Sequence, residues 1–191
     1  MDAAATASEL GVTTEAVELF RSSDAIDLHL ESFIWHRIFG YDLNRAHRGG
    51  LFGRSFFGHA DFPTARDCGL GGATWVITTN PARSARGRRR AFEHNLRALR
   101  ALLDDSPGIT HVRTGKEFRA ARRAGEHAAF IGIQGGNALD DGIEALELIA
   151  DRSVLRVTLI HLTSSRLGAS SARAPRAAQG SPTLAGRTSN G

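Results

Sequence analysis

Four strand-like segments separated by helix-like segments most constrain how this chain can fold. Runs of β-branched and apolar residues predict strands at residues 25–30, 72–80, 128–134 and 154–162. Capping residues and apolar residues at helical spacing predict helices at 14–21, from 80 past 103, at 114–125 and at 141–152. This alternation predicts an α/β fold in which parallel strands are joined by helical crossovers.

The helices after the second strand carry the clearest local signals. Asn80 can cap the first of them with Pro81 at its first position, and an apolar face follows, made of Phe92, Leu96, Leu99 and Leu103. Thr114 and Glu117 have the spacing of a capping box at the start of the next helix, and Gly125 can end it. The last predicted helix has an apolar side made of Ile143, Leu146 and Ile149.

Residues 31–63 show neither the pattern of a strand nor apolar residues at helical spacing, and they are rich in glycine, histidine and aromatic residues. We expect a long loop here. Loops of this length are uncommon in compact domains and are usually functional. This segment contains His36, His47 and His59, which could reach a ligand from the loop.

Polar side chains fall at the C-terminal ends of three predicted strands. His29 and Glu31 end the first strand, Gln134 the third and His161 the fourth, and ligands of parallel sheets bind at this edge. In the stretch IDLHLES, Asp27, His29 and Glu31 occupy alternate positions and therefore share one face. An imidazole beside a carboxylate suits zinc or a similar ion. The alternative is an ordinary hydrogen-bonded pair at a strand end, and the spacing alone does not choose between the two.

The composition indicates one globular domain, because the chain has 191 residues of which 41% are hydrophobic and 23% charged. Cys68 is the single cysteine, so we expect no intramolecular disulfide and a small buried hydrophobic side chain at this position. No apolar stretch approaches the ~20 residues of a membrane helix. The N-terminal stretch has no basic start followed by an apolar core, so we expect a cytoplasmic protein without membrane contact.

The positive charge of the chain is carried almost entirely by arginine. The run RSARGRRR at residues 83–90 has the composition of a nucleic-acid patch. The alternative is a solvated helix face. We favour the helix face and expect no nucleic-acid partner, because the neighbouring Phe92 falls on the apolar side of the predicted helix, where it cannot stack on bases.

Taken together, four motifs resemble the membrane dipeptidase family, the renal dipeptidase-like metallopeptidases. They occur in order as IDLHLES, HADFPTARDCGLGGATWVITTN, FIGIQGGNAL and VTLIHLTSSRLGASS, and they extend over about residues 25–171. The resemblance implies a (β/α)8 TIM barrel with two zinc ions that hydrolyses dipeptides through a metal-bound water. Two metal ions lower the pKa of a shared water and polarise the scissile carbonyl.

The resemblance also assigns roles to individual positions. His29 corresponds to a metal-binding histidine, and Glu31 stands where the family has a metal-binding aspartate. Gln134 stands at the glutamate that bridges the two zinc ions, and His161 corresponds to a substrate-contacting histidine. A neutral amide offers one good oxygen and an NH2 group that repels metal. We therefore expect at most one zinc ion here.

The expected domain is an incomplete TIM barrel of about four β/α units at residues 25–171, preceded by a helical lead-in at 1–24. Relatives supply two further metal-binding histidines from later strands. Residues 172–191 have no acids and few large apolar residues, which predicts a disordered tail. A reading-frame shift would produce such a composition, and a genuine disordered tail is the alternative.

The expected function is that of a dipeptidase-like metallohydrolase acting on a small peptide or another small amide. The alternative is a non-catalytic relative that binds a small ligand. Gln134 favours the alternative, whereas His29 and His161 favour the enzyme. Half a barrel leaves two strand edges unpaired, so we also expect association through these edges, for example into a homo-oligomer.

Overall fold

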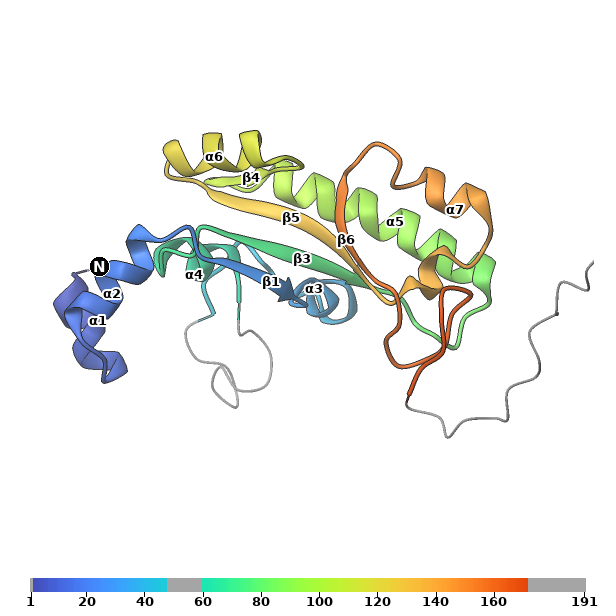
Figure 1. Cartoon of the computed structure of the whole chain (residues 1–191), viewed down its shortest axis with the longest axis horizontal. Coiled ribbons are helices and arrows are strands. Elements are labelled where there is room, and N and C mark those ends of the chain that lie inside the picture. The colour runs from blue at the N-terminus through green and yellow to red at the C-terminus, as the bar shows by residue number, and fades with distance from the viewer. Residues whose placement is uncertain (1, 48–59, 172–191) are drawn as a thin grey trace, which may run out of the picture.

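A computed structural model describes residues 2–47 and 60–171. Its centre is a parallel sheet of five strands (Figure 1), which are β1 Ile26–Leu30, β3 Gly72–Thr78, β4 Ile109–His111, β5 His127–Gln134 and β6 Val154–Thr158. The strand order is β1-β3-β5, and β4 and β6 share the far edge of β5. The short β4 pairs with the first three residues of β5, and β6 pairs with the last four. The predicted parallel α/β arrangement is confirmed.

Helices connect and flank these strands. Those described are α1 Ala3–Leu10, α2 Thr14–Ser22, α3 Phe33–Phe39, α4 Phe62–Asp67, α5 Ala85–Asp104, α6 Gly115–Arg123, the short 3-10 helix η1 Gly136–Leu139 and α7 Ile143–Glu147. Figure 1 shows α1 and α2 at one end of the sheet and α7 at the other, with the strands running between them. Since β1, β3 and β5 all point away from α1 and α2, their C-terminal ends meet at the opposite edge.

One face of the sheet is covered by helices and forms the main core. The fully buried Trp75 and Ile77 of β3 and Ile131 of β5 pack with the α5 face Phe92, Leu96, Leu99 and Leu103. Phe33 of α3 and Phe62 of α4 close the same cluster. All eight residues of β5 are buried, as its apolar sequence predicts for a parallel strand covered on both sides. The predicted apolar face of α5 is confirmed.

The opposite face of the sheet is covered only in part by described elements. Near the start of β5, Phe118 of α6 stacks on Phe130 with ring centroids 6.0 Å apart, and this pair forms a second, smaller core. Further along the strands this face carries polar side chains and Gly132. A Cβ atom at Gly132 would lie 2.7 Å from Thr74 Cγ2, so no larger residue fits between β3 and β6. The site residues lie on this face.

Helix starts and ends follow the local chemistry, with one correction to the prediction. The capping box of Thr114 and Glu117 is confirmed. The α5 helix does not begin at Asn80 and Pro81. Ser84 is its N-cap and accepts from the N–H of Gly87, while Asn80 accepts from the N–H of Ala82 and stabilises a turn. An Asn side chain serves a turn as readily as a helix start, and sequence did not distinguish them.

The expectation of a loop over residues 31–63 is wrong for part of that segment. Residues 33–39 form α3 and α4 begins at Phe62, while 48–59 lie outside the described residues. The side chain of Phe33 is fully buried against the sheet, and Gly40 ends α3 in the left-handed conformation with φ 66°. Tertiary burial therefore stabilises a helix whose aromatic residues have weak intrinsic propensity.

The last predicted helix and strand are shorter than expected, and several short elements were missed, among them α1, α4, β4 and η1. α7 covers only Ile143–Glu147, and Ile143 is 65% exposed, so the predicted apolar side is not a core face. β6 ends at Thr158, which places His161 beyond the strand. The unpredicted elements α1 and β4 are short, and they lack the long periodic patterns that identify a helix or strand from sequence. The predicted tail at 172–191 lies outside the described residues.

Candidate functional site at the carboxyl ends of the strands

The ends of β1 and β3 are joined by a direct side-chain contact. Thr78 Oγ1 donates to Glu31 Oε1 over 2.6 Å, and the same carboxylate oxygen lies 3.8 Å from His29 Nε2. The side chains of His29 and Glu31 are 36% and 38% exposed, so both remain open to solvent or to a ligand. The structure therefore brings the two predicted residues together, as alternate strand positions require.

The other nitrogen of His29 faces a cation. Arg156 of β6 places a terminal guanidinium nitrogen 2.5 Å from His29 Nδ1. Because arginine can only donate, Nδ1 must be the acceptor, and the proton of the neutral ring then lies on Nε2, the side of Glu31. This contact crosses the inner face of the sheet and joins the first and last strands of the described barrel segment.

Gln134 occupies the end of β5 with its register partner Thr78 on one side and Thr158 on the other. Its side chain is 9% exposed, and its Oε1 is a buried acceptor without a hydrogen-bond partner among the described residues. Buried polar atoms are nearly always paired, so an unpaired one at a strand end indicates a position for a ligand or a water. The next residue, Gly135, begins the turn into η1.

His161 lies in the exposed turn after β6, not at the strand end that sequence predicted. It still approaches the site, because a Cβ atom at Gly135 would lie 3.7 Å from His161 Cβ. Its backbone carbonyl accepts from Ser170 Oγ at 3.3 Å. The structure thus places His161 beside the β5 turn, next to Gln134, with its side chain exposed.

The histidines of the predicted loop have local roles instead. His36 Nδ1 lies 2.9 Å from the carbonyl of Tyr41, and the backbone N–H of His47 donates to the buried Asp61 at 2.8 Å. Burial raises the pKa of Asp61, but hydrogen bonds from His47 and Thr64 outweigh burial, and the pKa lies below its usual value. Asp61 is therefore the charged N-cap of α4. His59 lies outside the described residues.

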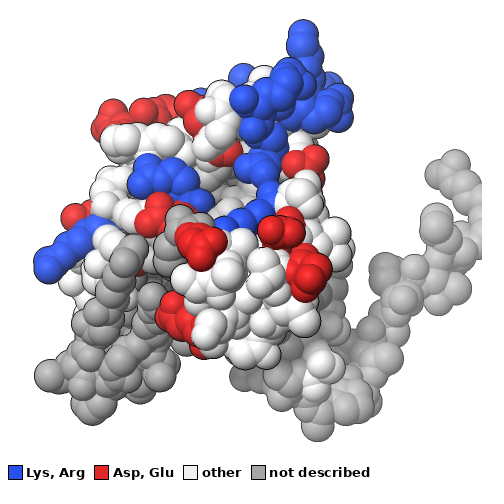
Figure 2. Space-filling model, turned by 90° about the vertical axis from the view of Figure 1, so that its left-hand side faces the viewer, with Lys and Arg blue, Asp and Glu red and all other residues white. Residues whose placement is uncertain are grey.

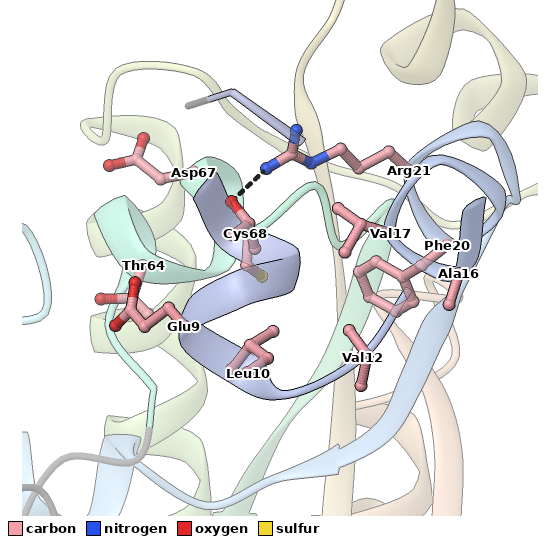
Figure 3. Close-up of a pocket in the computed structure, with 11 residues that line it drawn as sticks. Glu9, Leu10, Val12, Ala16, Val17, Phe20, Arg21, Thr64, Asp67 and Cys68 are labelled. Carbon is pink, nitrogen blue, oxygen red and sulfur yellow. Dashed lines mark hydrogen bonds between the residues drawn. The ribbon is translucent and has the colours of Figure 1, made fainter. Parts of the chain in front are cut away.

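A separate hollow lies away from these strand ends. A cavity of about 610 Å³ lies between α1, α2 and α4, and Figure 3 shows Leu10, Val12, Val17 and Phe20 lining it. Since α2 leads into the start of β1, this cavity lies at the opposite edge of the sheet from Glu31 and Gln134. It contains none of the predicted site residues. Cys68 lies in its wall and is exposed, so the expectation of a buried cysteine is wrong.

Comparison with known proteins identifies the family of this chain. A family model described as membrane dipeptidase (peptidase family M19) matches residues 13–191. The chain belongs to the membrane dipeptidase family. The match continues beyond residue 171, where the resemblance in the strand motifs was expected to stop. A search of curated protein sequences gives no significant match.

Two solved structures are similar to this membrane dipeptidase family member. An amidohydrolase from Pseudomonas aeruginosa is 19% identical with a TM-score of 0.53, and the match covers 80% of this chain and 38% of that one. Dipeptidase AC, a metallopeptidase of the same family, is 17% identical with a TM-score of 0.58 over 72% of this chain and 43% of that one. The sheet is therefore part of a TIM-barrel fold, as predicted. The chain spans about two-fifths of the length of these structures.

The residues present do not fit the two-zinc centre that the family implies. His29, Glu31 and Gln134 offer one ring nitrogen, one carboxylate and one neutral amide, although two zinc ions bring four positive charges. Within residues 2–47 and 60–171, no three His, Cys, Asp or Glu side chains are grouped so as to hold a metal ion. The guanidinium of Arg156 against His29 adds a further positive charge that disfavours a metal cation at this imidazole.

Thr78 and Arg156 contact the predicted site residues Glu31 and His29, and the sequence prediction missed both. Thr78 is an unremarkable residue of a β-branched run, and only the pairing of β1 with β3 brings it to Glu31. For Arg156 a signal existed, because it is the one charged residue in the otherwise apolar segment VLRVTLI. A charge within a parallel strand is uncommon and indicates either a partner or a site.

The arginine run at 83–90 is partly neutralised by acidic residues from a distant part of the chain. Arg88 lies 3.1 Å from Asp140 in a largely buried ion pair, and Arg89 lies 2.5 Å from Asp141. The ion pairs of Arg88 and Arg89 give these two arginines a structural role on the helix face. Figure 2 shows the opposite end of the molecule, on the side of α1 and α2, where basic side chains gather at one corner with acidic side chains beside and below them. None of the described helices is both long and apolar enough to span a membrane.

Proposed function

We propose that this chain forms part of a dipeptidase-like hydrolase whose substrate site lies at the carboxyl ends of β1, β3, β5 and β6. Membership of the membrane dipeptidase family supports the reaction class. The observation that carries the proposal is the convergence of Glu31, Thr78 and Gln134 at this edge, with a buried unpaired acceptor on Gln134. In TIM-barrel enzymes the active site lies at this edge.

The proposed substrate is a small peptide or another small amide. The unpaired Oε1 of Gln134 can accept a hydrogen bond from an amide N–H. Glu31 keeps one oxygen, Oε2, outside its contact with Thr78, and this oxygen can accept from an N–H group or take up a proton. The site thus has hydrogen-bonding groups for an amide and one carboxylate for proton transfer.

A second candidate is a non-catalytic family member that binds a small ligand. Two observations favour it. Gln134 is neutral at the position of a bridging carboxylate, and the imidazole of His29 is engaged by Arg156. Without a strong electrophile, an amide carbonyl is poorly activated toward water, so binding would not lead to turnover.

Release of amino acids from a panel of dipeptides tests the first proposal and separates it from the second. The purified chain is assayed with and without added zinc, and bound metal is measured by elemental analysis. We expect turnover that is lost in Glu31→Gln and retained in Glu93→Gln, a control on the exposed Arg97 pair of α5. Binding of a dipeptide without turnover in either condition favours the second candidate. Neither binding nor turnover contradicts both.

A further inference from the structure

We propose that Arg156 gives this site a fixed cation in place of a metal ion, and that the site binds the carboxylate of a small ligand without metal. The inference rests on the proposed function only for the choice of site. The experiment that tests it measures ligand binding, so an absence of hydrolysis would not contradict it. It concerns three groups on the inner face of the sheet, which are the Arg156 guanidinium, His29 and Gln134.

The guanidinium of Arg156 is held in a defined orientation. The register pairs Arg156 with Gly132 on β5, and the side chain reaches across β5 and β3 to His29 Nδ1. A Cβ atom at Gly132 would lie 2.7 Å from Thr74 Cγ2 and 3.0 Å from Val76 Cγ1, so the β3 side chains lie close against Gly132. One terminal nitrogen is thus held by His29, whereas the buried Nε has no hydrogen-bond partner among the described residues.

The charge of Arg156 has no counter-ion in the described structure. No described Asp or Glu lies within ion-pair distance of its guanidinium, and its contact with His29 is to a neutral acceptor. Its Nε is buried and has no hydrogen-bond partner among the described residues. Two other partly buried arginines, Arg88 and Arg89, each have an aspartate. A partly buried cation without a counter-ion is costly, so the position of an anion is left open.

A carboxylate suits the N–H groups of the Arg156 guanidinium that do not contact His29. Arginine binds carboxylates through two parallel N–H groups, and Nε–H is one of the donors used. Glu31 cannot serve as this anion in the structure, because its Oε1 accepts from Thr78 and lies on the Nε2 side of His29. The missing anion must therefore come from outside the described residues, and we assign it to the ligand.

Gln134 adds a requirement for an N–H donor next to the carboxylate. Gln134 lies two residues beyond Gly132 on β5, so its side chain points to the same face as Arg156 on the neighbouring strand. Gln134 and Arg156 are therefore diagonal neighbours on adjacent strands. The unpaired Oε1 accepts, whereas Nε of Arg156 donates. The ligand that satisfies both is a small carboxylate with an N–H two bonds from its carboxylate carbon, as in N-acylamino acids.

Calorimetric titration of the full chain with N-acetylglycine tests this inference. EDTA is present throughout, and the neutral N-acetylglycinamide is the matched control ligand. We expect N-acetylglycine to bind about tenfold or more tightly than the amide, since a charge-assisted hydrogen bond is lost with the amide. Equal affinity for the two ligands, or binding of N-acetylglycine only after zinc is added, would overturn the inference.

Variants test the role of Arg156 itself. Arg156→Met should weaken N-acetylglycine binding about tenfold or more and leave N-acetylglycinamide binding unchanged, while Arg97→Met, which removes an exposed arginine of α5, should change neither. Arg156→Lys should bind N-acetylglycine with intermediate affinity, because lysine keeps the positive charge but lacks the planar pair of N–H donors. Unchanged binding in Arg156→Met contradicts the inference. If that variant does not fold by circular dichroism, the two-ligand comparison on the wild-type chain decides.

Discussion

The Thr78 hydroxyl donates to Glu31 Oε1 across 2.6 Å and joins the carboxyl ends of β3 and β1, although the two residues are 47 positions apart. The contact fixes one carboxylate oxygen within 3.8 Å of His29 Nε2. Hydrogen bonds to a charged group are stronger than neutral ones, so this contact orients the Glu31 side chain as well as connecting the strands.

Thr78→Val should lower the free energy of unfolding by about 1 kcal/mol, because it removes a charge-assisted hydrogen bond at a partly exposed carboxylate. Urea denaturation of the variant and the wild-type chain measures the difference. Thr78→Ser keeps the hydroxyl and should cost less. A loss in Thr78→Ser that exceeds the loss in Thr78→Val would show that the methyl packing of Thr78, rather than its hydroxyl, supports this edge.

The buried His127 should make stability fall at acidic pH. Its ring is 1% exposed, Nδ1 lies 3.1 Å from the carbonyl of Leu70 and Nε2 accepts from Trp75 Nε1 at 3.4 Å. Burial lowers the pKa of His127 below its usual 6.5, although the Leu70 contact opposes this. The folded state thus holds the neutral ring, and the unfolded state binds the proton first.

The contribution of His127 is fully present above about pH 6.5 and is lost as the pH falls below that value, because the unfolded chain then binds more protons. Urea midpoints measured from pH 8 to 5 test this. His111, whose pKa is also lowered by burial, contributes in the same direction. His127→Gln should flatten the slope without abolishing it. A slope identical to wild type in this variant would rule out His127 as a source.

Leu99→Ala should destabilise the chain by about 2–5 kcal/mol, because Leu99 is fully buried in the α5 core and its loss leaves a cavity. Ile143→Ala is the matched comparison on α7. Its side chain is 65% exposed, so we expect a change within about 0.5 kcal/mol. Thermal and urea unfolding of both variants provide the measurement. A large loss in Ile143→Ala would indicate that another segment covers α7.

Cys68 should react with Ellman's reagent in the native chain, because its thiol is exposed in the wall of the cavity between α2 and α4. We expect one thiol to be titrated without denaturant. Cys68→Ser provides the blank. Reaction that appears only on unfolding would support the buried position expected from sequence and contradict the structure of this cavity.

Local sequence signals predicted the elements that depend on neighbouring residues. The α5 face and the capping box of Thr114 and Glu117 each involve residues within one or a few helical turns, so periodicity and capping rules were enough. The same rules failed for α3, where burial of Phe33 outweighs weak propensity, and for α7, where an apolar side faces outward. Burial depends on which surfaces meet, and that information is not local.

The sequence by itself determined the alternation of parallel strands and helices and placed His29, Glu31 and Gln134 at strand ends. Only the tertiary structure decided what these residues contact. Arg156 meets His29 across 127 positions because β6 pairs with β5 and β1 pairs with β3 in the same sheet. Strand order, register and sheet curvature fix such contacts, and they arise from packing of the whole sheet, whereas residue spacing specifies only the face of each strand.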